Sequence, residues 1–213
     1  YAQRLAQVLP LSQELEKLHP KPEIPATQEQ LDDYRLLTKI GAGGMGVVYE
    51  ALQVSLNRRV AVKLLSRSFV TDEEQRKQFE NEALIIARLH HPNIVQVLSA
   101  KCTPKRCYYA MEMINGVGLQ QYSFKNLREV ARAGLQAANA LAYAHSCRVL
   151  HRDIKPANLL IDKEEHVYVS DFGIAFVTAE PSKTLVDPRS GTIRYMAPEK
   201  LLRAENTFAT DQY

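Results

Sequence analysis

Apolar and polar positions alternate over short runs between Tyr34 and Met113, and this pattern predicts a β-rich segment. In one run Lys63 shares a face with Ala61 and not with Val62, because side chains alternate along a strand. An inward-facing lysine needs a partner of opposite charge. The expected strands are residues 34–40, 47–52, 59–65, 94–100 and 107–113.

A helical period replaces this alternation in residues 71–89 and again in residues 127–147. The first helix places three apolar residues and one acid on a single face, at Phe79, Glu82, Ala83 and Ile86. Further expected elements are strands at 159–161 and 166–170 and a short helix near Glu199. This order predicts two lobes of α+β type.

The beginning of the chain differs from the rest. Residues 1–33 contain several closely spaced prolines, at positions 20, 22 and 25, and we interpret them as a linker or docking tail. Because the chain begins with Tyr1 rather than Met, we also expect further sequence upstream.

Composition narrows the class of protein. The 213 residues are 46% hydrophobic and 24% charged, which is ordinary for a globular protein. A net charge of +3 is too small to predict binding to nucleic acid or to an anionic membrane, and no apolar run is long enough for a transmembrane helix. Three cysteines predict free thiols in a reducing, cytoplasmic compartment, so a disulfide or zinc site at Cys102 and Cys107 is disfavoured.

A glycine-rich segment, residues 41–46, joins the first two expected strands. Glycines let backbone N–H groups approach phosphates without obstruction by Cβ. Taken alone, the segment also fits a plain hairpin or a dinucleotide-binding turn. A dinucleotide-binding turn opens a helix, whereas residues 47–52 are expected to form a strand.

The expected partner of Lys63 and four short motifs lie further along the chain. Glu82, on the apolar face of the first helix, can supply the partner that Lys63 needs. The remaining motifs are His151-Arg152-Asp153-Ile154-Lys155-Pro156-Ala157-Asn158, Asp171-Phe172-Gly173, Gly191-Thr192 and Ala197-Pro198-Glu199. Each is common by chance, but their order and spacing together are not.

In this order the motifs resemble the signature set of eukaryotic-type (Hanks-type) serine/threonine protein kinases, and the bacterial branch most closely. The resemblance covers residues 34–213. It implies a two-lobed kinase fold of α+β class. The small β-rich lobe, which holds one main helix, is expected at 34–113, and a partial, mainly helical large lobe is expected at 114–213. The resemblance also implies ATP and Mg²⁺ as cofactors, and phosphoryl transfer to serine or threonine of protein substrates, including the protein itself. Bacterial relatives often have a transmembrane helix and a sensor further along the chain, so the full-length protein could be anchored outside this segment.

The resemblance also assigns catalytic roles. Asp153 would accept the proton of the substrate hydroxyl, Lys155 would neutralise the transferring phosphoryl group, and Lys63 would hold the ATP phosphates. Glu82 would position Lys63. Lys155 is typical of the serine/threonine branch. The implied magnesium ligands, whose hard oxygens suit that ion, are Asn158 and Asp171.

Residues implied to bind ATP fall in the phosphate loop, around the base and in the hinge. They are Ile40, Gly41, Gly43, Gly46, Val48, Ala61, Lys63, Glu82, Met111, Glu112, Met113, Ile114 and Leu160. A further apolar set resembles the column that links the two lobes, and it comprises Ile86, Val97, His151 and Phe172. His151 is therefore expected to be a packed structural residue rather than a general base.

Regulation is implied by Arg152, which resembles the phosphate-binding arginine of kinases that are switched by a phosphorylated loop. Thr184 is the first candidate phosphosite and Ser182 the second. Thr192 resembles the threonine that packs beside Asp153 and shapes the platform for a protein substrate.

Two expectations limit this assignment. A pseudokinase, a binding or scaffold module of the same fold, is the main alternative, but such modules usually lose one of Lys63, Asp153 or Asp171. Asp211 resembles the first residue of the central helix of the large lobe, an aspartate that normally braces the backbone around His151 and Arg152. We therefore expect an incomplete large lobe and an inactive or barely stable fragment. Glu199 would then lack its usual arginine partner.

Overall fold

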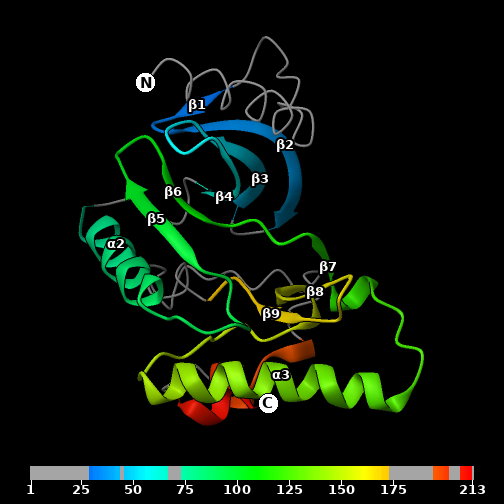
Figure 1. Ribbon diagram of the computed structural model, residues 1–213. Helices are drawn as coiled ribbons and strands as arrows, with labels where there is room; N and C mark the ends of the chain where they lie inside the picture. Colours follow the sequence, from blue (N-terminus) through cyan, green and yellow to red (C-terminus); the bar gives the residue numbers. More distant parts are fainter. Residues whose placement is uncertain (1–28, 44–45, 67–72, 173–193, 202–206, 213) are drawn as a thin grey trace, which may run out of the picture.

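The computed structural model describes residues 29–43, 46–66, 73–172, 194–201 and 207–212, and the tail expected at 1–33 lies mostly outside these ranges. A six-stranded sheet has the strand order β1-β2-β3-β4-β6-β5, and all its neighbours are antiparallel. Figure 1 shows this curved sheet above the rest of the molecule. The bounds are β1 Gln30–Leu31, β2 Tyr34–Gly43, β3 Gly46–Gln53, β4 Arg58–Leu65, β5 Val97–Cys102 and β6 Cys107–Glu112.

A second, three-stranded sheet has the order β7-β8-β9 and lies beside the longest helix, α3 (Figure 1). Its strands are β7 Gly116–Gly118, β8 Leu159–Asp162 and β9 Val167–Val169. The helices are α2 Glu73–Ala87, α3 Leu127–Ser146, α5 Pro198–Leu201 and the short 3-10 helices η2 Leu119–Gln121, η3 Pro156–Asn158 and η5 Phe208–Asp211. Among the described residues, no helix has the length and apolar character needed to cross a membrane.

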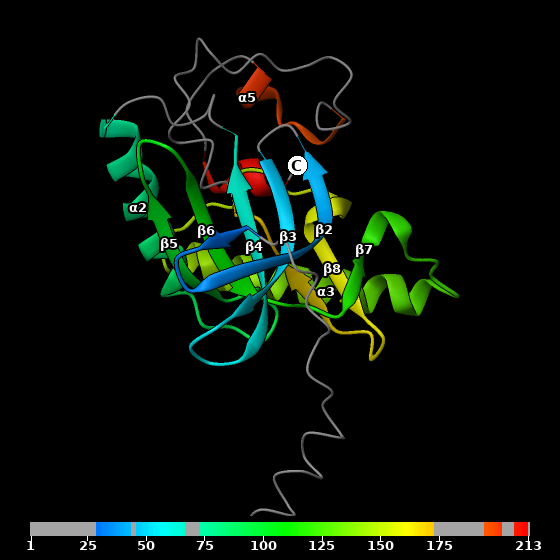
Figure 2. The same cartoon turned by 90° about the horizontal axis from the view of Figure 1, so that it is seen from above.

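Strand alternation sorts the side chains of β4 as expected. Val60 and Val62 join an apolar cluster with Tyr34 on one face of the sheet. Ala61 faces the other way, into the main core, where it meets residues of α2 such as Phe79. Figure 2 shows α2 standing next to β5, at the edge of the six-stranded sheet. The face of β4 that bears Lys63 is therefore the face covered by α2.

Helix α3 begins at Asn126, whose side chain accepts a hydrogen bond from the backbone N–H of Glu129 at 3.0 Å. Its buried stripe consists of small residues, which allow close packing, at Ala133, Ala137, Ala140 and Ala144. The loop before β5 connects the two sheets, because Val95 N–H donates to the carbonyl of Val169 and Val169 N–H donates to that of Asn93. These bonds fix where β9, and the residues after it, lie relative to the upper sheet.

Element ends differ from the expected ones by a few residues, as in β5, which spans Val97–Cys102 rather than 94–100, and two strands are additional. The sheet begins at Gln30 rather than at Tyr34, because β1 pairs with β2 and Leu31 is buried. Strand β7 was not expected, since its sequence Gly-Val-Gly has little strand propensity and its pairing with β8 defines it.

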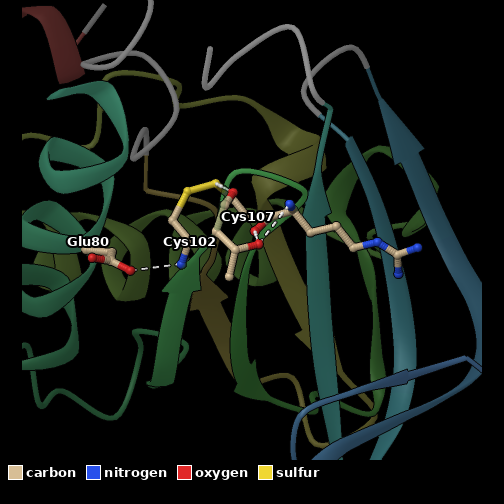
Figure 3. The surroundings of a disulfide bond; sticks show 5 residues. Glu80, Cys102 and Cys107 are labelled. Carbon is tan, nitrogen blue, oxygen red and sulfur yellow. Dashed lines mark hydrogen bonds between the residues drawn. A yellow bond between two sulfur atoms is a disulfide. The ribbon is translucent and has the colours of Figure 1, made fainter. Parts of the chain in front are cut away.

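The expectation of free thiols is wrong for one pair, because the structure joins Cys102 and Cys107 by a disulfide (Figure 3). The two cysteines stand directly opposite each other in the β5–β6 register, which brings their sulfur atoms together. The N–H of Cys102 also donates to Glu80 of helix α2 at 2.9 Å. Cys147 is free and exposed.

Candidate active site

The residues expected around the adenine base come together on the inner face of the upper sheet. Ala61 and Met111 are buried in the main core. Partly buried apolar residues of the same cluster are Val48, Met113, Ile114 and Leu160. Ile40, at the far end of β2, is 47% exposed, and Glu112 is exposed while its N–H donates to the carbonyl of Gln96.

The three described glycines of the expected phosphate loop differ in what they require. Gly46 has a φ of 151°, and a Cβ there would lie 2.1 Å from the carbonyl oxygen of Leu64. At Gly41 a Cβ would make ordinary contact with Val48, and at Gly43 it would meet nothing within 4 Å. Gly46 is therefore needed where the backbone of β3 comes close to that of β4, whereas Gly43 leaves open space above the sheet.

Lys63 pairs with Asp171 rather than with Glu82, which corrects the expectation from the sequence. The Lys63 Nζ lies 2.9 Å from Oδ1 of Asp171. Glu82 instead lies beside Arg152, with 3.7 Å between Oε1 and Nη1. Glu82 lies on α2 as expected, but in the structure its carboxylate is next to Arg152 and not next to Lys63.

The environment of Glu82 alters its protonation. Burial raises the pKa of Glu82 from its ordinary value of 4.5 to about 7, and the nearby charge of Arg152 opposes this rise. A half-buried carboxylate of this kind is close to half-protonated at neutral pH.

Asp153 is held by two side chains from its own segment. Lys155 Nζ lies 2.7 Å from Oδ2 of Asp153, and the amide nitrogen of Asn158 donates to the same oxygen at 3.0 Å. Asn158 also donates to the backbone carbonyl of Asp153 at 2.8 Å. The three residues expected to act together are thus in direct contact, and the nitrogen bonds leave the amide oxygen of Asn158 as the ligand atom for a cation.

The backbone before Asp153 is strained and braced. Arg152 has a φ of 67°, in the left-handed region that non-glycine residues rarely adopt. The buried carboxylate of Asp211 accepts hydrogen bonds from the N–H groups of His151 and Arg152, both at 2.7 Å. The resemblance implied this brace for Asp211, and the structure confirms it.

His151 is a packed residue, as expected. Its side chain is fully buried, its Nε2 lies 2.9 Å from the carbonyl oxygen of Ser170, and its ring centroid is 4.7 Å from that of Phe172. Burial lowers the pKa of His151, opposed by the bond to Ser170. The other three members of the expected column, Ile86, Val97 and Phe172, are buried together in the main core.

Asp171 accepts two donors on one oxygen. Besides Lys63, the hydroxyl of Tyr109 donates to Oδ1 at 2.6 Å. Burial raises the pKa of Asp171, but the charge of Lys63 and both hydrogen bonds outweigh it, so this pKa lies below its ordinary value. Asp171 is therefore an anion, and among the described residues no hydrogen bond or ion pair engages its second oxygen, which can bind a cation. Sequence reasoning missed Tyr109, although its register opposite Lys63 on β6 provides the signal.

A cation that prefers oxygen ligands would need further ligands besides the side chains of this site. Among the described residues, no group of three or more His, Cys, Asp or Glu side chains could hold a metal ion by itself. Asn158 and Asp171 supply hard oxygens of the kind that Mg²⁺ binds together with substrate phosphates and water.

Other expected site residues lie outside the described ranges, among them Thr184, Ser182 and Thr192. Glu199 has a different partner in the structure, because the hydroxyl of Thr210 donates to its carboxylate at 2.7 Å. Thr210 is brought there by a capping box with Thr207 at the start of η5.

Comparison with known proteins agrees with this geometry. The sequence profile of the protein kinase domain matches residues 34–213. The chain is 35% identical over 187 residues to the probable serine/threonine-protein kinase PknB of Lactococcus lactis and 36% identical over 189 residues to PknE of Mycobacterium bovis. These alignments cover 85% and 86% of this chain but 30% and 33% of the two relatives, so the chain spans about a third of their length.

A solved structure shows the same fold. The kinase domain of Mycobacterium tuberculosis PknI, in a form with one cysteine replaced by alanine, superposes with a TM-score of 0.71 at 29% sequence identity. The match covers 89% of this chain and 72% of that one.

Proposed function

Because the chain belongs to the protein kinase domain family, we propose that the protein transfers the γ-phosphate of ATP to serine or threonine hydroxyls of proteins. The family generally uses ATP and Mg²⁺ for this reaction. Contact of Asp153 with both Lys155 and Asn158 is the observation that most strongly supports the proposal. The alternative of a non-catalytic module is not favoured, because Lys63 and Asp171 are both in place beside this group.

Asp153 is the residue that orients the attacking hydroxyl and takes up its proton. Its carboxylate is nearly buried, and the donors on Oδ2 hold it in one orientation. A carboxylate needs no raised pKa for this task, since alignment of the hydroxyl is a large part of its contribution. Lys155, at 2.7 Å, places a positive charge where the transferring phosphoryl group passes.

ATP would bind between the sheets with its base among apolar side chains of the main core, including Ala61, Met111 and Leu160. The backbone of Glu112, Met113 and Ile114 would receive the edge of the base. Gly41, Gly43 and Gly46 would bring the β2–β3 turn over the phosphates.

Asn158 and Asp171 would hold magnesium, which supplies charge neutralisation at the β- and γ-phosphates. Lys63 would leave Asp171 and contact the α- and β-phosphates, and Glu82 would exchange Arg152 for Lys63. This change of partners moves α2 toward β4.

Protein substrates, including further copies of this protein, are the proposed partners. The platform for them would include Thr192. Arg152 would bind a phosphate on the segment between Asp171 and Glu199.

Purified full-length protein incubated with Mg·ATP and a serine- and threonine-containing substrate tests the function. Asp153→Asn and Lys63→Met should each lower phosphoryl transfer at least ~100-fold while the circular dichroism spectrum stays unchanged. Lys101→Met is the matched control, because Lys101 is an exposed lysine of β5 that pairs with Asp32. Undiminished transfer by Asp153→Asn, or phosphate found only on tyrosine, would overturn the proposal.

A further inference from the structure

Tyr109 and Lys63 are direct neighbours across the strands β4 and β6. Opposite residues of an antiparallel pair project from the same face, so both side chains point to the side of the sheet that α2 covers. Both reach the same atom, since Lys63 Nζ lies 2.9 Å and Tyr109 Oη 2.6 Å from Oδ1 of Asp171. The nucleotide lysine and a tyrosine therefore share one oxygen of the proposed magnesium ligand.

The tyrosine is fixed in this position by packing. It is 3% exposed, its ring centroid lies 6.5 Å from that of Phe79 on α2, and Lys63 Nζ lies 5.9 Å from its ring centroid. A buried hydroxyl needs a hydrogen-bond acceptor, and Asp171 Oδ1 is that acceptor for Tyr109.

We propose that Tyr109 is a positioning residue for Asp171. Its hydroxyl holds Oδ1, so that Oδ2 stays directed at the magnesium of a bound nucleotide when Lys63 has moved to the phosphates. This inference rests on the proposed function and adds a residue that lies outside the sequence motifs. Without the hydroxyl, Lys63 would be the one remaining donor to Asp171 among the residues that the structure describes, and Lys63 cannot serve the carboxylate and the phosphates equally well.

Strand β6 contains a matched control. Tyr108, the preceding residue, is also buried, and its hydroxyl also donates to an aspartate, Asp32 Oδ2, at 2.6 Å. Because side chains alternate, Tyr108 lies on the opposite face of the sheet, in the cluster that contains Tyr34. Tyr108→Phe and Tyr109→Phe remove the same group from the same strand, on the two different faces.

The test uses full-length protein and measures ADP binding by calorimetry, first with EDTA and then with increasing Mg²⁺. Tyr109→Phe should raise the Mg²⁺ concentration for half-maximal enhancement of ADP binding about tenfold, as expected for a lost hydrogen bond to a charged group. Its metal-free affinity for ADP should stay within about twofold, because Lys63 is unchanged. In phosphoryl transfer at saturating ATP, excess Mg²⁺ should restore kcat, while Tyr108→Phe should match the unaltered protein throughout.

Three results would overturn the inference. These are an unchanged Mg²⁺ requirement in Tyr109→Phe, an equal loss in Tyr108→Phe, and higher activity of Tyr109→Phe at every Mg²⁺ concentration. The last result would mean that the hydroxyl holds back the reaction. Magnesium-dependent ADP binding without any phosphoryl transfer by the unaltered protein would instead refute the proposed function, and the binding measurements would still decide the role of Tyr109.

Discussion

The carboxylate of Glu82 lies 3.7 Å from the guanidinium of Arg152, and this ion pair joins helix α2 to the segment that holds Asp153. Both side chains are largely shielded from water, with 20% of Glu82 and 29% of Arg152 exposed. Lys63, the partner expected for Glu82, is meanwhile bound to Asp171. The position of α2 and the environment of Asp153 are therefore coupled through one pair of charges.

Removing Arg152 should leave the carboxylate of Glu82 shielded and without the guanidinium beside it. We expect Arg152→Gln to lower the free energy of unfolding by about 1 kcal/mol at pH 8, and Glu82→Gln in the same chain to recover most of that loss. Urea unfolding of the two single variants and the double variant measures the coupling. Strictly additive losses would show that the pair contributes nothing.

The pKa of Glu82 also predicts how stability depends on pH. Burial raises this pKa from 4.5 to about 7, so the folded protein binds the proton more tightly than the unfolded chain does. The contribution of Glu82 to stability should therefore fall as pH rises from about 4.5 to about 7 and stay level above that range. The difference in unfolding free energy between the unaltered protein and Glu82→Gln, measured at intervals from pH 4.5 to 8.5, isolates this effect. A difference independent of pH would contradict it.

Two glycines of the β2–β3 turn should respond differently to alanine. At Gly46 the backbone conformation is unfavourable for other residues and a Cβ would clash with the carbonyl of Leu64, so Gly46→Ala should cost about 2 kcal/mol or more of stability. At Gly43 there is open space, so Gly43→Ala should keep the melting temperature within a few degrees. If the two variants have the same melting temperature, the pairing of β3 with β4 does not depend on Gly46.

Hydrophobic periodicity predicts well which face of a strand or helix a side chain lies on. It does not predict which residue of another element that side chain contacts. Period 2 in β4 and period 3.6 in α2 correctly place Lys63 and Glu82 toward each other's elements. Which acid Lys63 meets depends on where the fold places Asp171 and α2, and no local pattern encodes that placement. Similarly, the alternation of β6 gives Tyr109 a face, but only the register between the non-consecutive strands β4 and β6 sets it opposite Lys63.

Two short strands that form only by pairing with another strand could not be predicted from the sequence either. Strand β7 exists through its pairing with β8, and β1 through its pairing with β2. By contrast, the brace from Asp211 to His151 was anticipated, because it follows from a recognisable set of motifs at fixed spacing. The motif residues of the site are thus largely predictable, and their partners in the resting arrangement are not.

Phosphorylation should occur between Asp171 and Glu199, first at Thr184 and second at Ser182. A phosphate brings about −1.5 to −2 charges, which the Arg152 guanidinium can bind in place of Glu82. Mass spectrometry after incubation with Mg·ATP locates the phosphate, with Asp153→Asn protein as the unreacted control. Alanine at both positions should lower activity several-fold. Full activity of that double variant, with neither residue modified in the unaltered protein, would contradict this prediction.

Reducing the disulfide between Cys102 and Cys107 should weaken the fold slightly and leave phosphoryl transfer unchanged. The bridge closes a short loop, with a sequence separation of 5, so its loss removes at most about 2 kcal/mol. Backbone bonds between Thr103 and Arg106 still close the hairpin. The bond from Cys102 N–H to Glu80 involves no sulfur, so α2 keeps this attachment.

Thiol titration and urea unfolding with and without dithiothreitol measure both effects. The native protein should show one reactive thiol among these three cysteines, that of the exposed Cys147, and three after reduction and unfolding. A variant with serine at positions 102 and 107 should be insensitive to the reductant and should transfer phosphate at a rate within twofold of the unaltered protein. Three reactive thiols before reduction would contradict the pairing. A large loss of activity on reduction, absent from the serine variant, would show that the oxidised hairpin does affect the site, through the contact of Cys102 with α2.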